Sequence, residues 1–243
     1  MRVSLISDTH AKHGRIVLPK EIRSSRVLPD LVGGDLLVHA GDFMTSGYSK
    51  SEALDFFTWL NELEYTNIVF IAGNHDRFAQ VVPDEMAELV AGFPKLTYLE
   101  DDFVEIEVGE EKIKIYGSPW QPWFHNWAFN LPRGGEELRS KWEAIPEDTD
   151  IVITHGPAQG RLDTSGEPWN TPNLGCELLT KRLVAIKPKM HVCGHIHGGR
   201  GHEFDGDTHY FNASILDESY HYSYSPFNFD WNVKTNEVSM IQR

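Results

Sequence analysis

The sequence has few cysteines, few basic residues and no long apolar run. Two of its 243 residues are cysteine, Cys176 and Cys193, and they form neither a CxxC pair nor a disulfide framework. Lysine and arginine number 22 against 36 acidic residues, so the formal net charge is −14. Nucleic-acid-binding surfaces are usually basic, so this balance argues against a long nucleic acid as partner. A small phosphate ester stays compatible with it, because bound cations can dominate a local field.

The lack of apolar runs excludes a membrane-spanning helix, which needs about 18 or more apolar residues in succession. Met1 and Arg2 lead directly into the first apolar run, so no signal peptide is predicted. We therefore expect a cytoplasmic protein with no membrane partner. Hydrophobic residues make up 40% of the chain, and repeats and linkers are absent from the sequence, which favours a single domain over residues 1–243. The oligomeric state stays open, with a homodimer among the alternatives.

Five short apolar runs each lead into residues of types that commonly ligate metals. The runs are 3–7 before Asp8 and His10, 36–41 before Asp42, 67–72 before Asn74 and His75, 151–154 before His155, and 190–194 before His195 and His197. Apolar, β-branched runs of this length are typical of buried strands in a parallel sheet. Because ligands bind beyond the carboxyl ends of such strands, we expect these side chains to converge on one metal site.

Periodicity and turn residues predict the elements between these runs. Helices are expected over about 50–64, with a capping box at 49–52, and over 83–92, 138–145 and 178–186. An antiparallel hairpin is expected over 103–116, and strands that close a second sheet over 208–213 and 226–232. Residues 11–35 and 156–175 are expected to be mostly loop.

Residues 117–135 are a long predicted loop rich in aromatic residues, proline and glycine. Loops of this length are usually functional or disordered, and the aromatic content argues against disorder. Trp120, Trp123 and Phe124 are candidates for a wall that stacks on a nucleobase, with a packed cover over the sheet as the alternative. Arg133 is a candidate phosphate ligand, and a helix cap or a surface ion pair explains it equally well.

The residues at the strand ends match the needs of a dinuclear site. Two ions about 3.5–4 Å apart can clamp the attacking and leaving oxygens of an in-line phosphoryl displacement, and they need a shared carboxylate. Asp42 stands alone after its run, so it is the natural bridge. Asp8 and His10, on the same side of an extended chain, suit one ion.

The remaining ligand types suit the second ion. Asn74, through its amide oxygen, and His155 are the candidates. His195 and His197 share a strand face by the period of two, so each can serve one ion. An isolated motif of this kind is more often a turn, a cap or a structural histidine; the five together, each after a buried run, favour a metal centre.

These motifs resemble the calcineurin-like metallophosphoesterase superfamily. Its pattern is Asp-x-His, Gly-Asp, Gly-Asn-His-Asp/Glu, a lone His and Gly-His-x-His, and all five motifs occur here in order. The segments 117–124, 130–134, 154–157 and 194–197 look like the metallophosphoesterase domain-containing subfamily, which groups with class III cyclic-nucleotide phosphodiesterases. The resemblance implies an α/β fold, a four-layer α-β-β-α sandwich with two mixed sheets, and two divalent ions at the carboxyl ends of the strands.

The resemblance also implies roles for the motif residues. The first ion would be held by Asp8, His10, Asp42 and His197, and the second by Asp42, Asn74, His155 and His195. His75, paired with Asp76, would protonate the leaving oxygen, and a water bridging the ions would be the nucleophile. Asn74 would also contact the substrate. It would coordinate while His75 faces the substrate, because adjacent residues on an extended stretch point apart.

We predict hydrolysis of a small phosphodiester such as a 2′,3′- or 3′,5′-cyclic nucleotide. A phosphomonoesterase is the first alternative, although residues 41–47 lack the arginine of the protein phosphatase branch. A non-catalytic scaffold on the same fold is the second alternative, and the complete set of motif residues disfavours it. Oxygen and nitrogen ligands without thiolate suit Mn²⁺, Fe or Zn²⁺, and Mn²⁺ is the preferred prediction.

Overall fold

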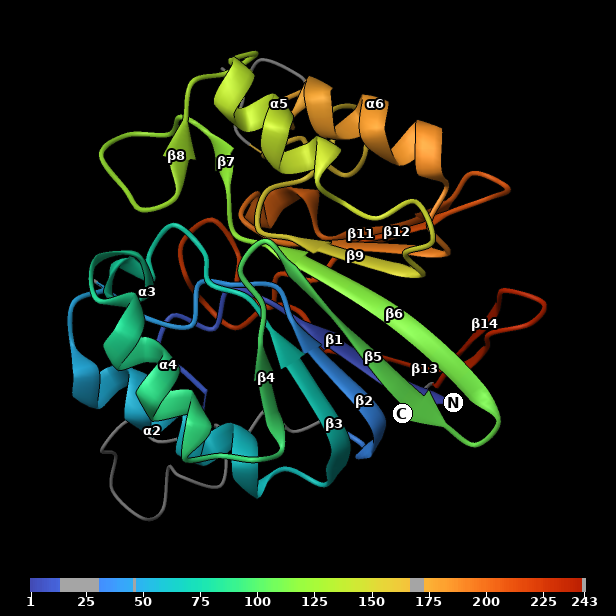
Figure 1. The fold of residues 1–243 in the computed structure, drawn as a ribbon, viewed down its shortest axis with the longest axis horizontal. Helices are drawn as coiled ribbons and strands as arrows, with labels where there is room; N and C mark the ends of the chain where they lie inside the picture. Colours follow the sequence, from blue (N-terminus) through green and yellow to red (C-terminus); the bar gives the residue numbers. More distant parts are fainter. Residues whose placement is uncertain (14–30, 46, 167–172, 242–243) are drawn as a thin grey trace.

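The computed structural model describes residues 1–13, 31–45, 47–166 and 173–241. The described residues form two six-stranded mixed sheets that face each other, with helices on both outer faces (Figure 1). The first sheet has the order β14-β13-β1-β2-β3-β4, and the second has the order β11-β12-β10-β9-β6-β5. This arrangement confirms the predicted four-layer α-β-β-α sandwich.

The first sheet combines four parallel strands with an antiparallel pair at one edge. Its strands are β1 (Arg2–Ile6), β2 (Gly34–His39), β3 (Tyr65–Phe70), β4 (Leu96–Tyr98), β13 (Phe227–Asn232) and β14 (Glu237–Met240). Its outer face is covered by α2 (Lys50–Glu62), α3 (Arg77–Val81) and α4 (Pro83–Ala91). The side chain of Ser49 caps α2 by accepting the N–H of Glu52, but Glu52 bonds Thr45 rather than Ser49, so the predicted capping box is half formed.

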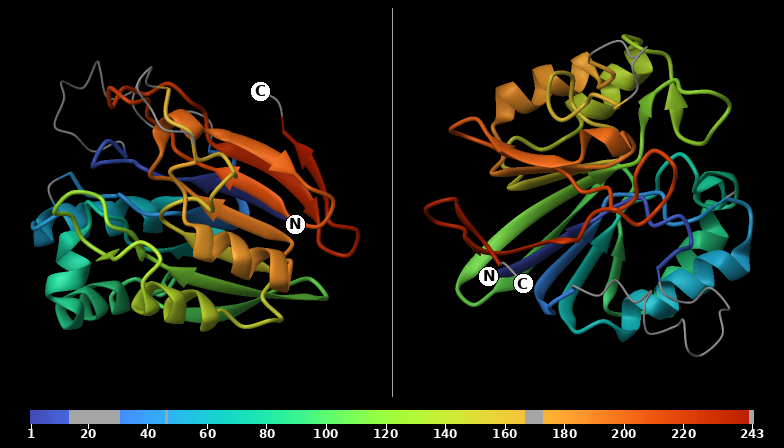
Figure 2. Two further views of the ribbon diagram at one scale, coloured as in Figure 1. Left: turned by 90° about the horizontal axis from the view of Figure 1, so that it is seen from above. Right: turned by 180° about the vertical axis from the view of Figure 1, so that it is seen from behind.

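The second sheet carries the predicted hairpin at its edge. Its strands are β5 (Asp102–Val108), β6 (Glu111–Ser118), β9 (Ile151–Thr154), β10 (Met190–Cys193), β11 (Gly201–Phe204) and β12 (His209–Asn212). The helices α5 (Glu136–Glu143) and α6 (Glu177–Ile186) lie over its outer face (Figure 2). Two short strands, β7 (Gln121–Pro122) and β8 (Asn130–Leu131), pair with each other inside the predicted aromatic loop.

Apolar residues on the facing sides of the sheets form the central core. Residues such as Leu5, Val38, Ile153 and Val192 are fully buried there, and a second set of apolar side chains packs each sheet against its helices. Strands buried on both faces explain the near-continuous apolar runs of the sequence. The core thus fixes the carboxyl ends of β1, β2, β3, β9 and β10 close to one another.

The strand over 226–232 lies in the first sheet, not in the second as the sequence pattern predicts. These residues form β13, which pairs antiparallel with β1, with Val3 opposite Phe229. Phe229 and Trp231 thereby enter the core between the sheets, a partnership that local pattern does not reveal. The short elements α3, β4, β11 and β14 are not predicted from the sequence. Residues 14–30 of the predicted 11–35 loop lie outside the described residues.

Acid should weaken the fold through His191, a buried residue of β10. Its Nε2 lies 2.8 Å from the Thr154 hydroxyl, and burial lowers the pKa of His191 to about 3. The unfolded chain has the ordinary value of about 6.5, so it binds a proton first as the pH falls, and stability is lost below that value. We expect this group to remove about 2 kcal/mol between about pH 7.5 and 5. Denaturant unfolding of His191→Gln should show a correspondingly flatter pH dependence, and equal slopes would contradict this account.

Candidate metal centre

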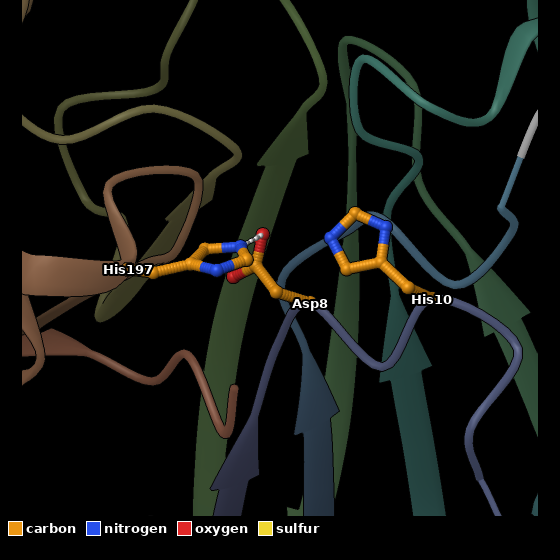
Figure 3. A group of neighbouring side chains, drawn as sticks. All are labelled: Asp8, His10 and His197. Carbon is orange, nitrogen blue, oxygen red and sulfur yellow. Dashed lines mark ion pairs between the residues drawn. The ribbon is translucent and has the colours of Figure 1, made fainter. Parts of the chain in front are cut away.

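Carboxylate and imidazole groups gather where the strands of the two sheets end. Among the described residues, three overlapping groups each place one ligand atom per residue within 4.8 Å of the others: Asp8, His10 and His197; His10, Asp42 and His75; and Asp8, Asp42 and His155. Figure 3 shows the first group, in which Asp8 lies between His197 and His10. Asp42 and Asp8 connect the groups, so the site is one continuous cluster.

Asp8 anchors the first group. Its Oδ1 lies 3.4 Å from His197 Nε2, and its Oδ2 accepts a hydrogen bond from the Ser214 hydroxyl at 2.6 Å. The backbone N–H of His195 also donates to this carboxylate at 3.1 Å. On the far side of its ring, His197 Nδ1 bonds the carbonyl of Asp217 at 2.9 Å. That bond leaves Nε2 for a ligand, as is usual for metal-binding histidines.

His10 provides a direct test of whether this cluster suits a cation. Its side chain is buried, yet neither Nδ1 nor Nε2 has a hydrogen-bond partner among the described residues. Its Nε2 lies 3.7 Å from Asp42 Oδ2. Burial lowers the pKa of His10 to about 4, so the ring is neutral. A buried, neutral imidazole without a partner is costly unless an ion takes its lone pair, so the first group fits a metal.

The ligands predicted for the second ion pass the same test through His155. Its Nδ1 donates to the carbonyl of Ala40 at 2.9 Å, so in a neutral ring Nε2 carries only a lone pair. That nitrogen lies 2.9 Å from Asn74 Oδ1 and 3.4 Å from Asp42 Oδ1. Three electron-pair donors therefore converge on one point. Their lone pairs repel one another unless a cation or an added proton lies between them, and oxygen and nitrogen donors of this kind suit a divalent metal.

The charges around the cluster favour positive occupants. Burial would lower the pKa of His155, but Asp42 reverses the effect and raises it to about 9. The pKa of His197 is likewise raised to about 9 against burial, through Asp8. Burial would raise the pKa of Asp8 and Asp42, yet His197 and His155 respectively hold both carboxyls below their usual range. Both carboxylates are thus ionised and inside the protein, the environment in which a divalent cation is most stabilised.

The backbone reaches this arrangement by tight turns rather than by extended chain. Asp8, His10, Asp42 and His195 all have positive φ, at 56°, 41°, 58° and 65°. The prediction that Asp8 and His10 share one side of an extended chain is therefore wrong, although both reach the first group. Left-handed residues are strained, and such strain is typical of functional sites.

His195 and His197 do not share a strand face, contrary to the prediction. β10 ends at Cys193, and His197 begins the short 3₁₀ helix η1 (His197–Gly199). Gly194 has to approach Asp8 closely, since a Cβ at this glycine would lie 2.2 Å from Asp8 Oδ2. The strand therefore stops and turns. His197 Nε2 lies 3.4 Å from Asp8 Oδ1, whereas the ring of His195 lies 5.0 Å from that of His155.

His75 lies at the edge of the cluster, on a turn. The N–H of Asp76 bonds the carbonyl of Gly73 at 3.1 Å, so the predicted extended stretch is wrong. The His75 ring stacks on Trp127 with centroids 4.1 Å apart and meets His10 edge-on at 4.6 Å. Its Nδ1 bonds the carbonyl of Thr45 at 2.6 Å. These contacts fix the ring and leave Nε2 to act on another molecule.

The predicted pairing of Asp76 with His75 is not present in the structure. Asp76 is fully buried, and its carboxylate accepts the N–H groups of Asp42, Met44 and Gly73 at 2.7–2.8 Å. Burial raises the pKa of Asp76 well above its usual range. The side chain joins the loop after β2 to the loop after β3. Asp76 is therefore a positioning residue for Asp42, not a partner of the His75 ring.

The aromatic loop divides into a packed part and an exposed part. Trp120 donates from its indole to Asp101 at 2.8 Å and packs against both helix-covered cores. Trp123 and Phe124 are 63% and 44% exposed and line a cavity of about 190 Å³ that also borders His195. Arg133 lines this cavity too, but its guanidinium bonds Glu177 and the carbonyls of Leu174 and Gly175.

Two further aromatic residues lie near the cluster; Tyr220 is not identified as a site residue from the sequence, and Trp127 is anticipated only as a member of the predicted aromatic loop. Tyr220 has a φ of 60°, and its ring lies 4.9 Å from that of His10 and 5.3 Å from that of His197. Trp127 forms the stack with His75. A concentration of aromatics at 220–224 is the available signal, but the chain has aromatics elsewhere, and only the tertiary structure brings these two to the cluster.

The four-layer sandwich and the oxygen and nitrogen donors at its strand ends fit a class of metal-dependent phosphoesterases. The chain belongs to the calcineurin-like phosphoesterase family, whose sequence pattern matches residues 1–199. Members of this family use a dinuclear divalent metal centre. The chain is 40% identical over 239 residues to metallophosphoesterase domain-containing protein 1 of Homo sapiens, a match that covers 90% of this chain and 67% of that protein.

Solved structures share the fold at much lower sequence identity. The protein TT1561 of Thermus thermophilus aligns with a TM-score of 0.62 at 14% identity, over 98% of this chain and 97% of that one. The phosphopantetheinyl hydrolase of Mycobacterium tuberculosis gives a TM-score of 0.61 at 14% identity, over 92% and 93%. Within the described part of the chain, every helix is too short or too polar to cross a membrane.

Proposed function

We propose that the protein hydrolyses phosphodiester bonds in a small substrate, specifically a 2′,3′- or 3′,5′-cyclic nucleotide. The observation that carries this proposal is the cavity beside His195. It places Trp123 and Phe124 next to the metal-ligand cluster, so an organic group can sit beside a phosphate held at the ligands. The acidic chain offers no basis for binding a long nucleic acid.

The preference for a diester follows from the charge at the cavity. Arg133, a cationic residue that lines it, is already paired with Glu177. A dianionic monoester would gain from a free guanidinium fork, whereas a diester carries one charge and needs less compensation. The phosphomonoesterase alternative is therefore less well supported.

The chain's own residues divide the work of the reaction. Two divalent ions would be held by Asp8, His10, Asp42, Asn74, His155 and His197, together with His195, whose ring lies 5.0 Å from that of His155. When bound, the ions supply Lewis-acid activation of water and phosphate. Asp76 and Gly73 keep the Asp42 loop in place. His75, fixed by Thr45 and Trp127, is oriented to donate a proton to the leaving oxygen.

A hydrolysis screen tests this function. Protein stripped with a chelator and reloaded with Mn²⁺, Fe²⁺ or Zn²⁺ is assayed on bis(4-nitrophenyl) phosphate, 4-nitrophenyl phosphate and both types of cyclic nucleotide. We expect turnover that depends on metal and favours diesters, with Mn²⁺ effective. A clear preference for the monoester would support the phosphomonoesterase alternative instead.

Trp120 and Trp123 should respond differently to truncation. Base–aromatic stacking is worth about 1–3 kcal/mol, so Trp123→Ala should raise the KM of a nucleotide diester about ten- to a hundredfold, with little change in melting temperature. Trp120 is partly buried against two helix-covered cores, so Trp120→Ala should cost about 3 kcal/mol of unfolding free energy, the lower end for a core aromatic residue, without changing relative KM values. Kinetics on a nucleotide diester and on a base-free diester, beside thermal melts, separate the two effects. Unchanged relative KM values for Trp123→Ala would end the stacking hypothesis.

A further inference from the structure

A buried hydrogen-bond acceptor lines the cavity beside His195. Gln121, in β7, is 1% exposed, and its Oε1 has no hydrogen-bond partner among the described residues. Buried polar atoms are nearly always paired, so an unpaired oxygen in a cavity wall indicates a missing donor. The cavity is also lined by apolar residues such as Pro122 and Pro157 and by the cationic Arg133, whose guanidinium already bonds Glu177.

The orientation of the Gln121 amide follows from its neighbour Asn130. Asn130 Oδ1 accepts the N–H of Phe124 at 3.1 Å, and its Nδ2 donates to the carbonyls of Phe124, His125 and Trp127 at 3.0–3.2 Å. The Asn130 amide is thus fixed in one orientation. The Gln121 atom 3.3 Å from Asn130 Oδ1 must therefore be the donor Nε2, and the other atom must be the acceptor Oε1.

The unpaired oxygen lies beside Gly156, on the side that also faces His195. A Cβ placed on Gly156 would lie 3.8 Å from Gln121 Oε1 and 4.0 Å from His195 Cδ2. These are ordinary contact distances, so a small group above Gly156 has room and touches both residues. Gly156 directly follows His155, and the aromatic edge of Phe124 meets His195 with ring centroids 5.1 Å apart.

We propose that Gln121 is a specificity-determining residue that accepts a hydrogen bond from an N–H group on the organic part of the substrate. The ligand class is a nucleotide whose base bears an amino group, with its flat face against Trp123 or Phe124 and its amino edge at Gln121 Oε1. This inference rests on the proposed function for the position of the phosphate at the cluster. A base without a donor at that edge leaves the buried oxygen unpaired and binds more weakly.

Equilibrium binding to the Mn²⁺-loaded protein tests the proposal. The probes are adenosine 5′-monophosphate and purine riboside 5′-monophosphate, which differ by one amino group. We expect the amino-bearing nucleotide to bind about tenfold more tightly, the effect of leaving a buried acceptor unpaired. Gln121→Met removes the acceptor and should bring the ratio of the two Kd values to about one. Gln80→Met is the matched control. The side chain of Gln80 accepts the N–H of Phe129, a residue of the aromatic loop that also contains Gln121. Gln80 itself is exposed and lies outside the cavity.

The outcomes separate this proposal from the proposed function. A ratio near one in the wild-type protein, an equal ratio in wild type and Gln121→Met, or no binding of either nucleotide would overturn the role of Gln121. The ratio of the two Kd values in the wild-type protein needs no substitution, so it tests the proposal even if Gln121→Met lowers the melting temperature. Hydrolysis of bis(4-nitrophenyl) phosphate, which has no base, reports separately on the phosphodiesterase activity. Its absence beside an intact tenfold ratio would remove the proposed function and leave the nucleotide pocket standing.

Discussion

Replacing Asp42 with alanine is expected to remove metal and most activity at once. Its Oδ2 faces His10 and its Oδ1 faces His155, at 3.7 and 3.4 Å, so one carboxylate is placed between the two ligand groups. Groups that merely support a ligand typically contribute about 10–100-fold, so the loss for a bridging ligand should exceed about a hundredfold. Metal analysis of the purified variant and diester turnover are the measurements.

A control separates loss of metal from damage to the fold. Asp101→Asn alters another partly buried carboxylate, one that bonds Ser118, Trp120 and Lys141 outside the three ligand groups. It should retain two metals even if its melting temperature falls. An Asp42→Ala protein that keeps two metals and near-normal turnover would refute the bridging role.

His75→Ala is expected to keep its metals and lose turnover. The ring is fixed by Thr45 and Trp127 at the edge of the cluster, which is the position of a proton donor to the leaving oxygen. A general acid contributes about 10²–10⁴-fold, and the loss should be smaller for a 4-nitrophenyl diester, whose leaving group needs little protonation. Turnover of esters with good and poor leaving groups measures this difference.

The His75 variant also distinguishes an acid from a ligand. His75 shares a possible ligand group with His10 and Asp42, so loss of one metal from the variant would reassign it as a ligand. Equal losses for good and poor leaving groups would count against the acid role. His125→Ala removes a histidine of the neighbouring aromatic loop that belongs to none of the three ligand groups, and it should leave the leaving-group dependence unchanged.

The buried strands and the convergence of their ends can be predicted from local pattern, whereas the four layers are implied by the resemblance to the metallophosphoesterase superfamily. Apolar runs such as 67–72 identify buried strands, and the sheet then fixes the position of the polar residue that follows each run. The prediction for 226–232 names the wrong sheet because the pairing of this strand with β1 joins residues more than 220 positions apart. When a strand fits either of two facing sheets, tertiary packing decides which sheet it joins, and the residues of the strand do not.

The errors at the site come from assuming extended chain beyond the strand ends. Asp8, His10 and His195 occupy left-handed turns, which short-range pattern does not reveal for residues other than glycine. Asp76 follows His75 in sequence, yet its carboxylate turns inward to bond the Asp42 loop. Tyr220 reaches the cluster from the segment between β12 and β13, far in sequence from any motif. Chemical type is readable from sequence, whereas the direction of each side chain depends on these turns.

Titration of metal into chelator-stripped protein tests whether the site is a dinuclear phosphodiesterase centre. Turnover of bis(4-nitrophenyl) phosphate is followed while Mn²⁺ is added, with bound metal per chain measured at each point. We expect no turnover without metal and a rise in turnover that levels off at two bound ions per chain. Turnover in the stripped protein, or saturation of binding at a single ion with full activity, would contradict a dinuclear phosphodiesterase centre.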